Sequence, residues 1–180
     1  MSSSYYPVAS YDRLASIITM SISIGLITLT LFSYYLILFS PPSSPALGIT
    51  AVTFITVITT ITLSVPYLFS PIGYNLTSTE LIIQRPIKSI LIPYNRITEI
   101  EKLKWLWKGV RLGGSGGLYG YLGLFYFFGA GKVWMYVTNK NKMLLVKCIN
   151  DKQYAISPNS LDFLAEAKIK IATNRPNRDR

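Results

Sequence analysis

RLGGSGGLYGYLGLFYFFGAGK, residues Arg111 to Lys132, holds eight glycines and six tyrosine or phenylalanine rings, with no charge between its two ends. A phosphate-binding P-loop would need Gly-Lys-Ser/Thr before a helix, but Val133 and strand-like sequence follow Gly131-Lys132. A dinucleotide-binding fingerprint would need glycine where Tyr119 stands. The glycines therefore predict sharp turns and close packing of rings against the backbone. The rings expected to pack in this way are Tyr119, Tyr121, Phe125 and Phe127.

Short runs rich in β-branched and aromatic residues surround this stretch. ELIIQRP (80–86) and SILIPYNRITEIEKL (89–103) precede it, and KVWMYVTNKNKMLLVKCINDKQYAIS (132–157) closes it. The last run predicts three strands joined by tight turns at 138–142 and 150–152. We therefore expect several antiparallel strands in chain order.

The last element is predicted to be a helix. Ser157 is the expected N-cap, with Pro158 at the first helical position. Glu166 and Lys170 form a favourable i,i+4 pair. The fold predicted for 74–172 is an α+β domain, a bent antiparallel β-sheet or barrel capped by this helix, with a basic tail at 173–180.

The N-terminal part of the chain contains no Asp, Glu, Lys or Arg from Leu14 to Thr79, a run of 66 residues. Within it, 14–39 and 46–69 each exceed the roughly 20 apolar residues that cross a bilayer as a helix. SPPSSP at 40–45 stops a helix and favours a turn. A buried helix pair of a soluble protein is the alternative, but it would lack a solvated face. We predict a two-helix transmembrane hairpin.

Charge predicts how this hairpin is oriented. The loop at 40–45 has no basic residue, whereas Arg85 and Lys88 follow the second span. The positive-inside rule then places the N-terminal segment 1–13 and the C-terminal domain in the cytoplasm, with the loop outside. We expect an integral protein of the cell membrane.

Small polar residues fall on one face of each span, at helical spacing. Such stripes allow close helix packing in lipid, within the hairpin or with a partner helix. A conduction path is the alternative, but neither span contains an ionisable residue, the usual mark of transport. The predicted packing face consists of Ser16, Thr19, Ser23 and Thr30 in the first span and Thr53, Thr56 and Thr60 in the second.

Two longer segments resemble a known family. YNLTSTELIIQRPIKSILIPYNRITEIE (74–101) is similar to the opening of membrane-linked prokaryotic pleckstrin-homology-like (PH-like) domains. The closer match, 113–164, resembles a bacterial PH family with a Gly-Ser-Gly-Gly-aromatic-Gly stretch, an Ala/Val-Thr-Asn hairpin and a Tyr-x-Ile-Ser-Pro entry to the last helix. The resemblance covers roughly 74–170. It implies a PH-like fold at a membrane and brings no catalytic residues.

The resemblance does not extend to recognition of phosphoinositide headgroups. PH domains that bind those lipids use a basic loop between their first two strands. Here that loop is Thr77-Ser78-Thr79, which has no basic residue.

Few residues in the chain suit catalysis. Histidine is absent, and the single cysteine, Cys148, is expected to be a small core residue and not a nucleophile. Glu99 and Glu101 share one strand face, where they would hold a cation, serve as an acid–base pair or line a solvated surface. We expect no enzyme activity, no metal and no cofactor.

The candidate contact surface lies just before the glycine stretch. KLKWLWKGVR (102–111) combines four cations with two tryptophans and no acid. Tryptophan favours the headgroup layer, and each cation near an anionic membrane contributes about 1 kcal/mol. The alternative is a tryptophan in the core among ordinary solvated lysines. The candidate lipid or partner surface consists of Lys102, Lys104, Trp105, Trp107, Lys108 and Arg111.

These features predict a non-enzymatic, membrane-tethered binding or scaffold module. It would act at the cytoplasmic membrane surface through protein contacts, self-association among them, and through anionic lipid. The alternative is an accessory subunit of a larger membrane complex, docked through its hairpin. The formal net charge of +10 also suits binding of nucleic acid, but no recognition motif accompanies the charge. We therefore do not expect nucleic acid as a partner. The His-free composition, rich in Ile, Thr and Tyr, is typical of an archaeal thermophile.

Overall fold

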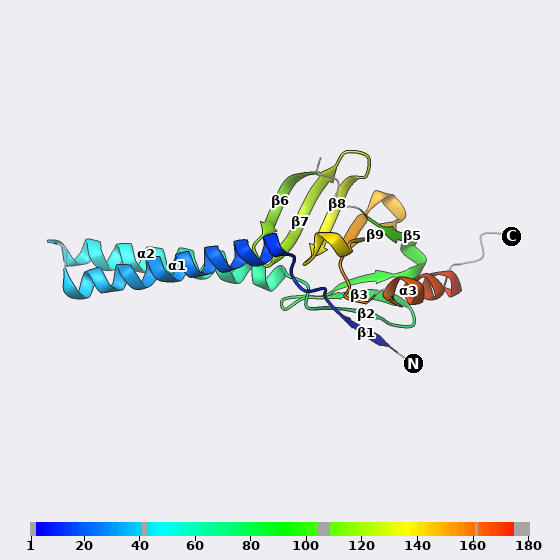
Figure 1. Cartoon of the computed structure of the whole chain (residues 1–180), viewed down its shortest axis with the longest axis horizontal. Coiled ribbons are helices and arrows are strands. Elements are labelled where there is room, and N and C mark those ends of the chain that lie inside the picture. The colour runs from blue at the N-terminus through cyan, green and yellow to red at the C-terminus, as the bar shows by residue number, and fades with distance from the viewer. Residues whose placement is uncertain (1–2, 41–42, 104–108, 161, 175–180) are drawn as a thin grey trace.

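The computed structural model describes residues 3–40, 43–103, 109–160 and 162–174. Two long helices extend from one side of a β-rich domain, and a third helix lies at the opposite end (Figure 1). The expected combination of two long apolar helices with a β domain and a C-terminal helix is therefore confirmed.

The helix pair consists of α1 (Arg13–Phe39) and α2 (Pro45–Phe69). At 1.5 Å per residue each is about 38–40 Å long, and both are long and apolar enough to cross a membrane, by length and composition. They contact each other in their middle parts, where the Oγ1 atoms of Thr30 and Thr59 lie 3.0 Å apart. The helices are thus compatible with membrane insertion as a hairpin.

The first sheet has four antiparallel strands in the order β1-β2-β3-β4. Its strands are β1 (Ser4–Pro7), β2 (Gly73–Leu76), β3 (Glu80–Gln84) and β4 (Ile90–Pro93). Strand β1 was not expected from the sequence. It comes from the segment before α1 and pairs with β2, so the chain enters and leaves the hairpin through neighbouring strands.

The second sheet has six strands in the order β5-β9-β10-β8-β7-β6. They are β5 (Ile97–Lys102), β6 (Gly109–Gly117), β7 (Gly120–Phe127), β8 (Gly131–Val137), β9 (Leu144–Cys148) and β10 (Gln153–Ile156). The predicted hairpin at 138–142 is wrong, because β10 lies between β8 and β9 and pairs in parallel with β8. The turn at 150–152 does join the antiparallel strands β9 and β10. Neither sheet closes into a barrel.

Side chains of both sheets and of α3 (Asp162–Thr173) form the larger hydrophobic cluster. Tyr74, Ile83, Val146 and Phe163 are fully buried there. A second cluster, with Phe127, Val133 and Met135 completely buried, lies within the six-stranded sheet and reaches Ala15 of α1. The first turn of α1 is therefore part of the domain core.

The prediction that Ser157 caps the last helix is wrong. The helix begins at Asp162, whose backbone N–H donates to Ser160 Oγ at 3.1 Å. Ser157 is fully buried instead, and its Oγ accepts the N–H of Thr138 at 2.9 Å. A hydroxyl in the core needs a partner, and this one connects β10 to the segment after β8.

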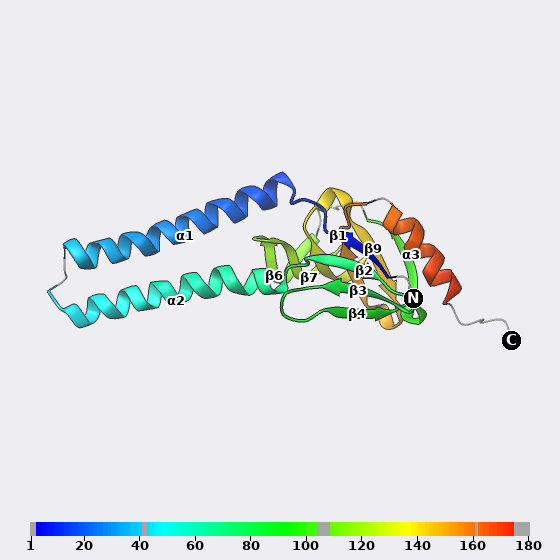
Figure 2. The ribbon, with the colours of Figure 1, turned by 90° about the horizontal axis from the view of Figure 1, so that it is seen from below.

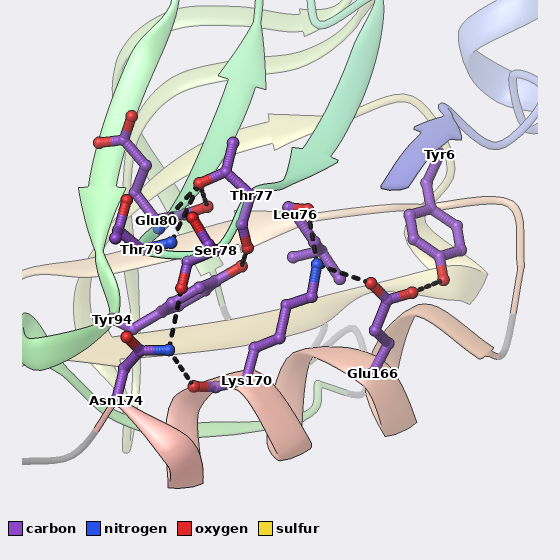
Figure 3. A network of polar contacts seen from close by, with 10 residues as sticks. All are labelled: Tyr6, Leu76, Thr77, Ser78, Thr79, Glu80, Tyr94, Glu166, Lys170 and Asn174. Atoms are coloured by element: carbon purple, nitrogen blue, oxygen red, sulfur yellow. Dashed lines mark hydrogen bonds and ion pairs between the residues drawn. The ribbon is translucent and has the colours of Figure 1, made fainter. Parts of the chain in front are cut away.

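Figure 3 shows how α3 holds the edge of the four-stranded sheet. Glu166 accepts a hydrogen bond from the Tyr6 hydroxyl of β1 and forms an ion pair with Lys170 at 2.8 Å. Lys170 also donates to the Leu76 carbonyl, and Asn174 donates to the Ser78 carbonyl. Lys170 and Tyr6 lower the pKa of Glu166 to about 2. The carboxylate is thus a clamp between α3 and β1.

This clamp predicts a pH-dependent stability. Because the pKa of Glu166 is lower in the folded chain than its ordinary 4.5, its stabilisation is complete above pH about 4.5 and disappears as the pH falls toward 2. Allowing for partial solvent screening, Glu166→Gln should cost about 1–2 kcal/mol at pH 6 and nothing near pH 2. Thermal unfolding of the full chain in detergent, measured across this range, checks the difference.

The matched control is Glu99→Gln, which removes one side of an exposed ion pair with Lys147. This change should cost less than about 0.5 kcal/mol. A cost for Glu166→Gln that is the same at pH 2 and pH 6 would contradict the clamp.

Candidate functional site

The glycine stretch forms a two-stranded ribbon, β6 and β7, whose backbone few other residues could adopt. Of its eight glycines, six have φ between 78° and 140°. Gly114 and Gly123 face each other across the strands, and a Cβ on Gly114 would lie 2.0 Å from the Leu122 carbonyl oxygen. Tyr121, Phe125 and Phe127 pack in the core behind them. The glycines therefore serve backbone geometry, as predicted.

The tip of this ribbon contacts both long helices. Thr19 Oγ1 of α1 donates to the Gly117 carbonyl at 3.1 Å and accepts the Tyr119 N–H at 2.9 Å. A Cβ on Gly117 would lie 2.6 Å from Ile18 Cδ1. The rings of Tyr119 and Tyr67, the latter on α2, meet edge to face at 5.7 Å. The close approach depends on glycine at the tip.

Asp12 fixes the start of α1 on the same sheet. Its side chain is buried, with 5% of the residue exposed. Oδ1 accepts the Ala15 N–H at 2.9 Å, which caps α1, and the Tyr121 hydroxyl at 3.2 Å. Oδ2 accepts the Lys140 N–H at 3.2 Å. One carboxylate thus joins α1, β7 and the segment after β8, so the hairpin and the domain are held in one orientation.

A cavity of about 1110 Å³ lies between the domain ends of the two long helices and the sheet. The helices are farther apart there than at the loop (Figure 2). Ile18 and Ile22 of α1 line one side, and residues of α2 such as Ile61 line another. The sheet wall combines glycines of β6 and β7 with larger side chains, among them Leu122, Leu124 and Trp134. The lining is predominantly apolar.

Arg85, which follows β3, is the first of two cations in this cavity. Its guanidinium carbon lies 5.6 Å from the ring centre of Phe69 and 5.3 Å from that of Tyr136. Its Nε donates to the Lys88 carbonyl at 2.7 Å. Two aromatic rings and a backbone carbonyl therefore hold the charge at the cavity wall.

Arg111 of β6 is the second cation. A Cβ on Gly116 would lie 3.2 Å from one of its terminal nitrogens, so the side chain runs along its own strand. Within the part of the chain that the structure describes, neither arginine forms an ion pair, and no acidic residue lines the cavity. The described lining of the cavity thus has a formal charge of +2, from these two arginines.

The structure describes only part of the predicted lipid or partner surface. Arg111 lines the cavity, while Lys102 is exposed at the end of β5, in register with Leu144. Lys104, Trp105, Trp107 and Lys108 lie outside the described residues.

The predicted acidic pair at Glu99 and Glu101 does lie on one strand face. Both carboxylates contact Lys147, at 3.0 and 2.8 Å respectively. Within the described residues, no group of three or more His, Cys, Asp or Glu could hold a metal ion. Burial raises the pKa of Cys148 to about 11, so its thiol is protonated at neutral pH.

The small polar residues of the spans have different environments. Thr30 contacts Thr59, and Thr56 contacts the Tyr34 hydroxyl at 3.3 Å. Thr19 contacts the ribbon tip, and Ser23 is half-buried. The remaining members of the predicted face are exposed, namely Ser16, Thr53 and Thr60.

Comparison with known proteins agrees with the fold. A family model described as a bacterial PH domain matches residues 72–170, or 99 of the 180 residues. A search of curated proteins gives no match, and neither does a search of solved structures.

Proposed function

We propose that this chain, which belongs to the bacterial PH domain family, is a non-enzymatic binding module tethered to the membrane by its helix hairpin. PH domains are generally binding modules, and α1 and α2 allow membrane anchoring. The module would act at the cytoplasmic membrane surface, through contacts with other proteins or with copies of itself and through anionic lipid.

The orientation of the sheet on the hairpin is the observation that carries this proposal. Asp12 and Thr19 join α1 to the β6–β7–β8 side of the domain. Strand β6 is the edge strand nearest the helices, and α3 lies at the far end, in both views (Figures 1 and 2). A hairpin that spans the bilayer would therefore present β6 and the cavity to the membrane surface.

Residues of β6 suit such a surface. Val110 and Leu112 are about half exposed, at 51% and 53%, and flank Arg111. Exposed apolar side chains are typical of contacts with the headgroup layer, and Arg111 adds a cation on the cavity side of the same strand. The predicted surface also includes Lys104, Trp105, Trp107 and Lys108, which precede this strand in the sequence but fall outside the residues that the structure describes.

The opposite end of the domain is a weaker candidate for binding. The turn at Thr77-Ser78-Thr79 has no basic residue, and Lys170 and Asn174 of the α3 region already bond to the backbone around it (Figure 3). We therefore assign ligand contact to the β6 side.

The alternative is an accessory subunit of a larger membrane complex. Thr53 and Thr60, which are exposed on α2, favour this second function. A stripe of that kind can support helix association in lipid. The two functions differ in which surface contacts the partner.

A photocrosslinking experiment in native membranes distinguishes these two functions. Benzoylphenylalanine would replace Leu112 on β6, Phe54 on α2 or Ile169 on α3, all of which are exposed. The binding module predicts adducts to protein or anionic lipid from position 112 and none from 169. Protein adducts from position 54, with none of either kind from 112, would overturn it in favour of the accessory subunit.

A further inference from the structure

The cavity between the hairpin and the sheet lies at the depth of the membrane interface if the hairpin spans the bilayer. A hydrocarbon core of about 30 Å needs only about 20 residues of each helix, whereas α1 has 27 and α2 has 25. With the loop at the far surface, the surplus lies at the domain end. There, Ile22 and Ile61 border the hydrocarbon, and the arginines lie on the sheet side, toward the headgroups.

The lining of the cavity has two chemically different parts. The helix side consists of isoleucine, valine, proline and phenylalanine side chains, with Thr62 as its single polar residue among those described, and it suits a hydrocarbon chain. The sheet side adds Arg85 and Arg111 and no acid among the described lining residues. An amphipathic anion matches this division, with its apolar part between the helices and its charge at the arginines.

The size of the cavity favours a large ligand. At about 1110 Å³ it exceeds the 300–1,000 Å³ typical of sites for small molecules. Glycines of β6 and β7 bring backbone into the sheet wall, beside the side chains of Leu122, Leu124 and Trp134. Arginine also pairs bidentately with phosphate, and Arg85 is already oriented by Phe69 and Tyr136.

We propose that this cavity holds one anionic phospholipid of the surrounding membrane, with its phosphate at Arg85 and Arg111 and an acyl chain between α1 and α2. The inference rests on the proposed function in one respect, that the hairpin spans the bilayer. The bound lipid would fill the space between helices and sheet and add to the fixed orientation of the domain.

Native mass spectrometry of the full chain tests this inference. The protein would be reconstituted in nanodiscs of phosphatidylglycerol and phosphatidylcholine, in equal amounts and with identical acyl chains, and then released and weighed. We expect one retained lipid per chain, with phosphatidylglycerol enriched tenfold or more. No retained lipid, or equal retention of the two lipids, would overturn the inference.

Two pairs of variants locate the bound lipid. Arg85→Gln combined with Arg111→Gln should abolish the enrichment of phosphatidylglycerol. The control combines Lys132→Gln with Lys152→Gln, which replace exposed cations outside the cavity lining, and it should keep the enrichment.

The second pair tests the acyl chain. Ile22→Trp should block the acyl chain, whereas Ile24→Trp, on the same helix but outside the lining, should not. Ile22→Trp removes no contact with Arg85, so it tests the site even if the double arginine variant fails to fold. Retention unchanged by the cavity variants would overturn the assignment of the site.

The two proposals fail in different ways. Capture from position 112 without any retained lipid would refute the lipid site and leave the binding module intact. Retained phosphatidylglycerol without capture from position 112 would support the lipid site and contradict partner contact at the exposed Leu112, which lies outside the cavity lining.

Discussion

Gly114→Ala should lower the free energy of unfolding by at least about 3 kcal/mol. This is the largest effect that we expect from a single substitution. The φ of Gly114 is 110°, which alone costs an alanine about 1–3 kcal/mol. The new Cβ would also lie 2.0 Å from the Leu122 carbonyl oxygen and 2.9 Å from Gly123 Cα. Both are backbone atoms, so the ribbon must separate to relieve the overlap. The midpoint temperature of thermal unfolding should fall by about 10 °C or more.

The neighbouring glycine supplies the control. Gly113 lies on the same strand, has no φ in the left-handed region, and a Cβ there would meet nothing within 4 Å. Gly113→Ala should therefore change stability by less than about 0.5 kcal/mol. Similar losses in the two variants would show that the ribbon does not depend on the paired glycines.

The second large effect is expected from Asp12→Ala, at about 2–4 kcal/mol. The substitution removes the cap of α1, worth about 1 kcal/mol. It also leaves the Tyr121 hydroxyl and the Lys140 N–H without the carboxylate that accepts from them in the folded chain, in bonds that are both 3.2 Å long. Hydrogen bonds of this length should contribute about 0.5–1.5 kcal/mol each. Thermal unfolding in detergent measures the total loss.

Asp12→Asn separates the cap from the charge. Its amide oxygen can still accept the Ala15 N–H, so we expect a loss about half that of Asp12→Ala. Asp162→Ala, at the exposed start of α3, should cost less than about 0.5–1 kcal/mol. A loss of that size for Asp12→Ala would mean that the carboxylate does not hold the hairpin to the sheet.

Features that depend on local sequence were predicted correctly. The charge-free run from Leu14 to Thr79 indicates two apolar helices, whatever they pack against. The glycine ribbon follows from steric freedom at each glycine, and the Glu166–Lys170 pair from helix periodicity. In each case the signal lies within a few residues of the structure that it produces.

Features that depend on distant partners were not predicted. Strand β10 is inserted between β8 and β9 because the chain returns beside β8 after an intervening strand, and no turn residue records that order. Strand β1 is too short to be recognised from its sequence, and it forms by pairing with the edge of β2. Ser157 has the sequence signature of a helix cap, but in the folded chain its hydroxyl accepts a hydrogen bond from the buried Thr138 N–H instead.

The candidate site was predicted only in part, for the same reason. Arg111 was included because it lies in a basic and aromatic segment. In the sequence, Arg85 indicates only the topology, and nothing in its neighbourhood points to Phe69 and Tyr136. Asp12, by contrast, stands immediately before α1, where an N-cap residue is expected, so its capping role was readable from sequence although its contacts with Tyr121 and Lys140 were not.

The most direct test of the central claim is the depth of two probes relative to the bilayer. In a Cys148→Ala background, a fluorophore on Leu112→Cys or Ile169→Cys of the full chain would be quenched by spin-labelled lipids in proteoliposomes. A domain held on its hairpin with β6 toward the membrane predicts strong quenching at 112 and little at 169, with the difference reduced by Asp12→Ala. Equal quenching at the two positions would contradict a fixed orientation, and stronger quenching at 169 would place the wrong face against the bilayer.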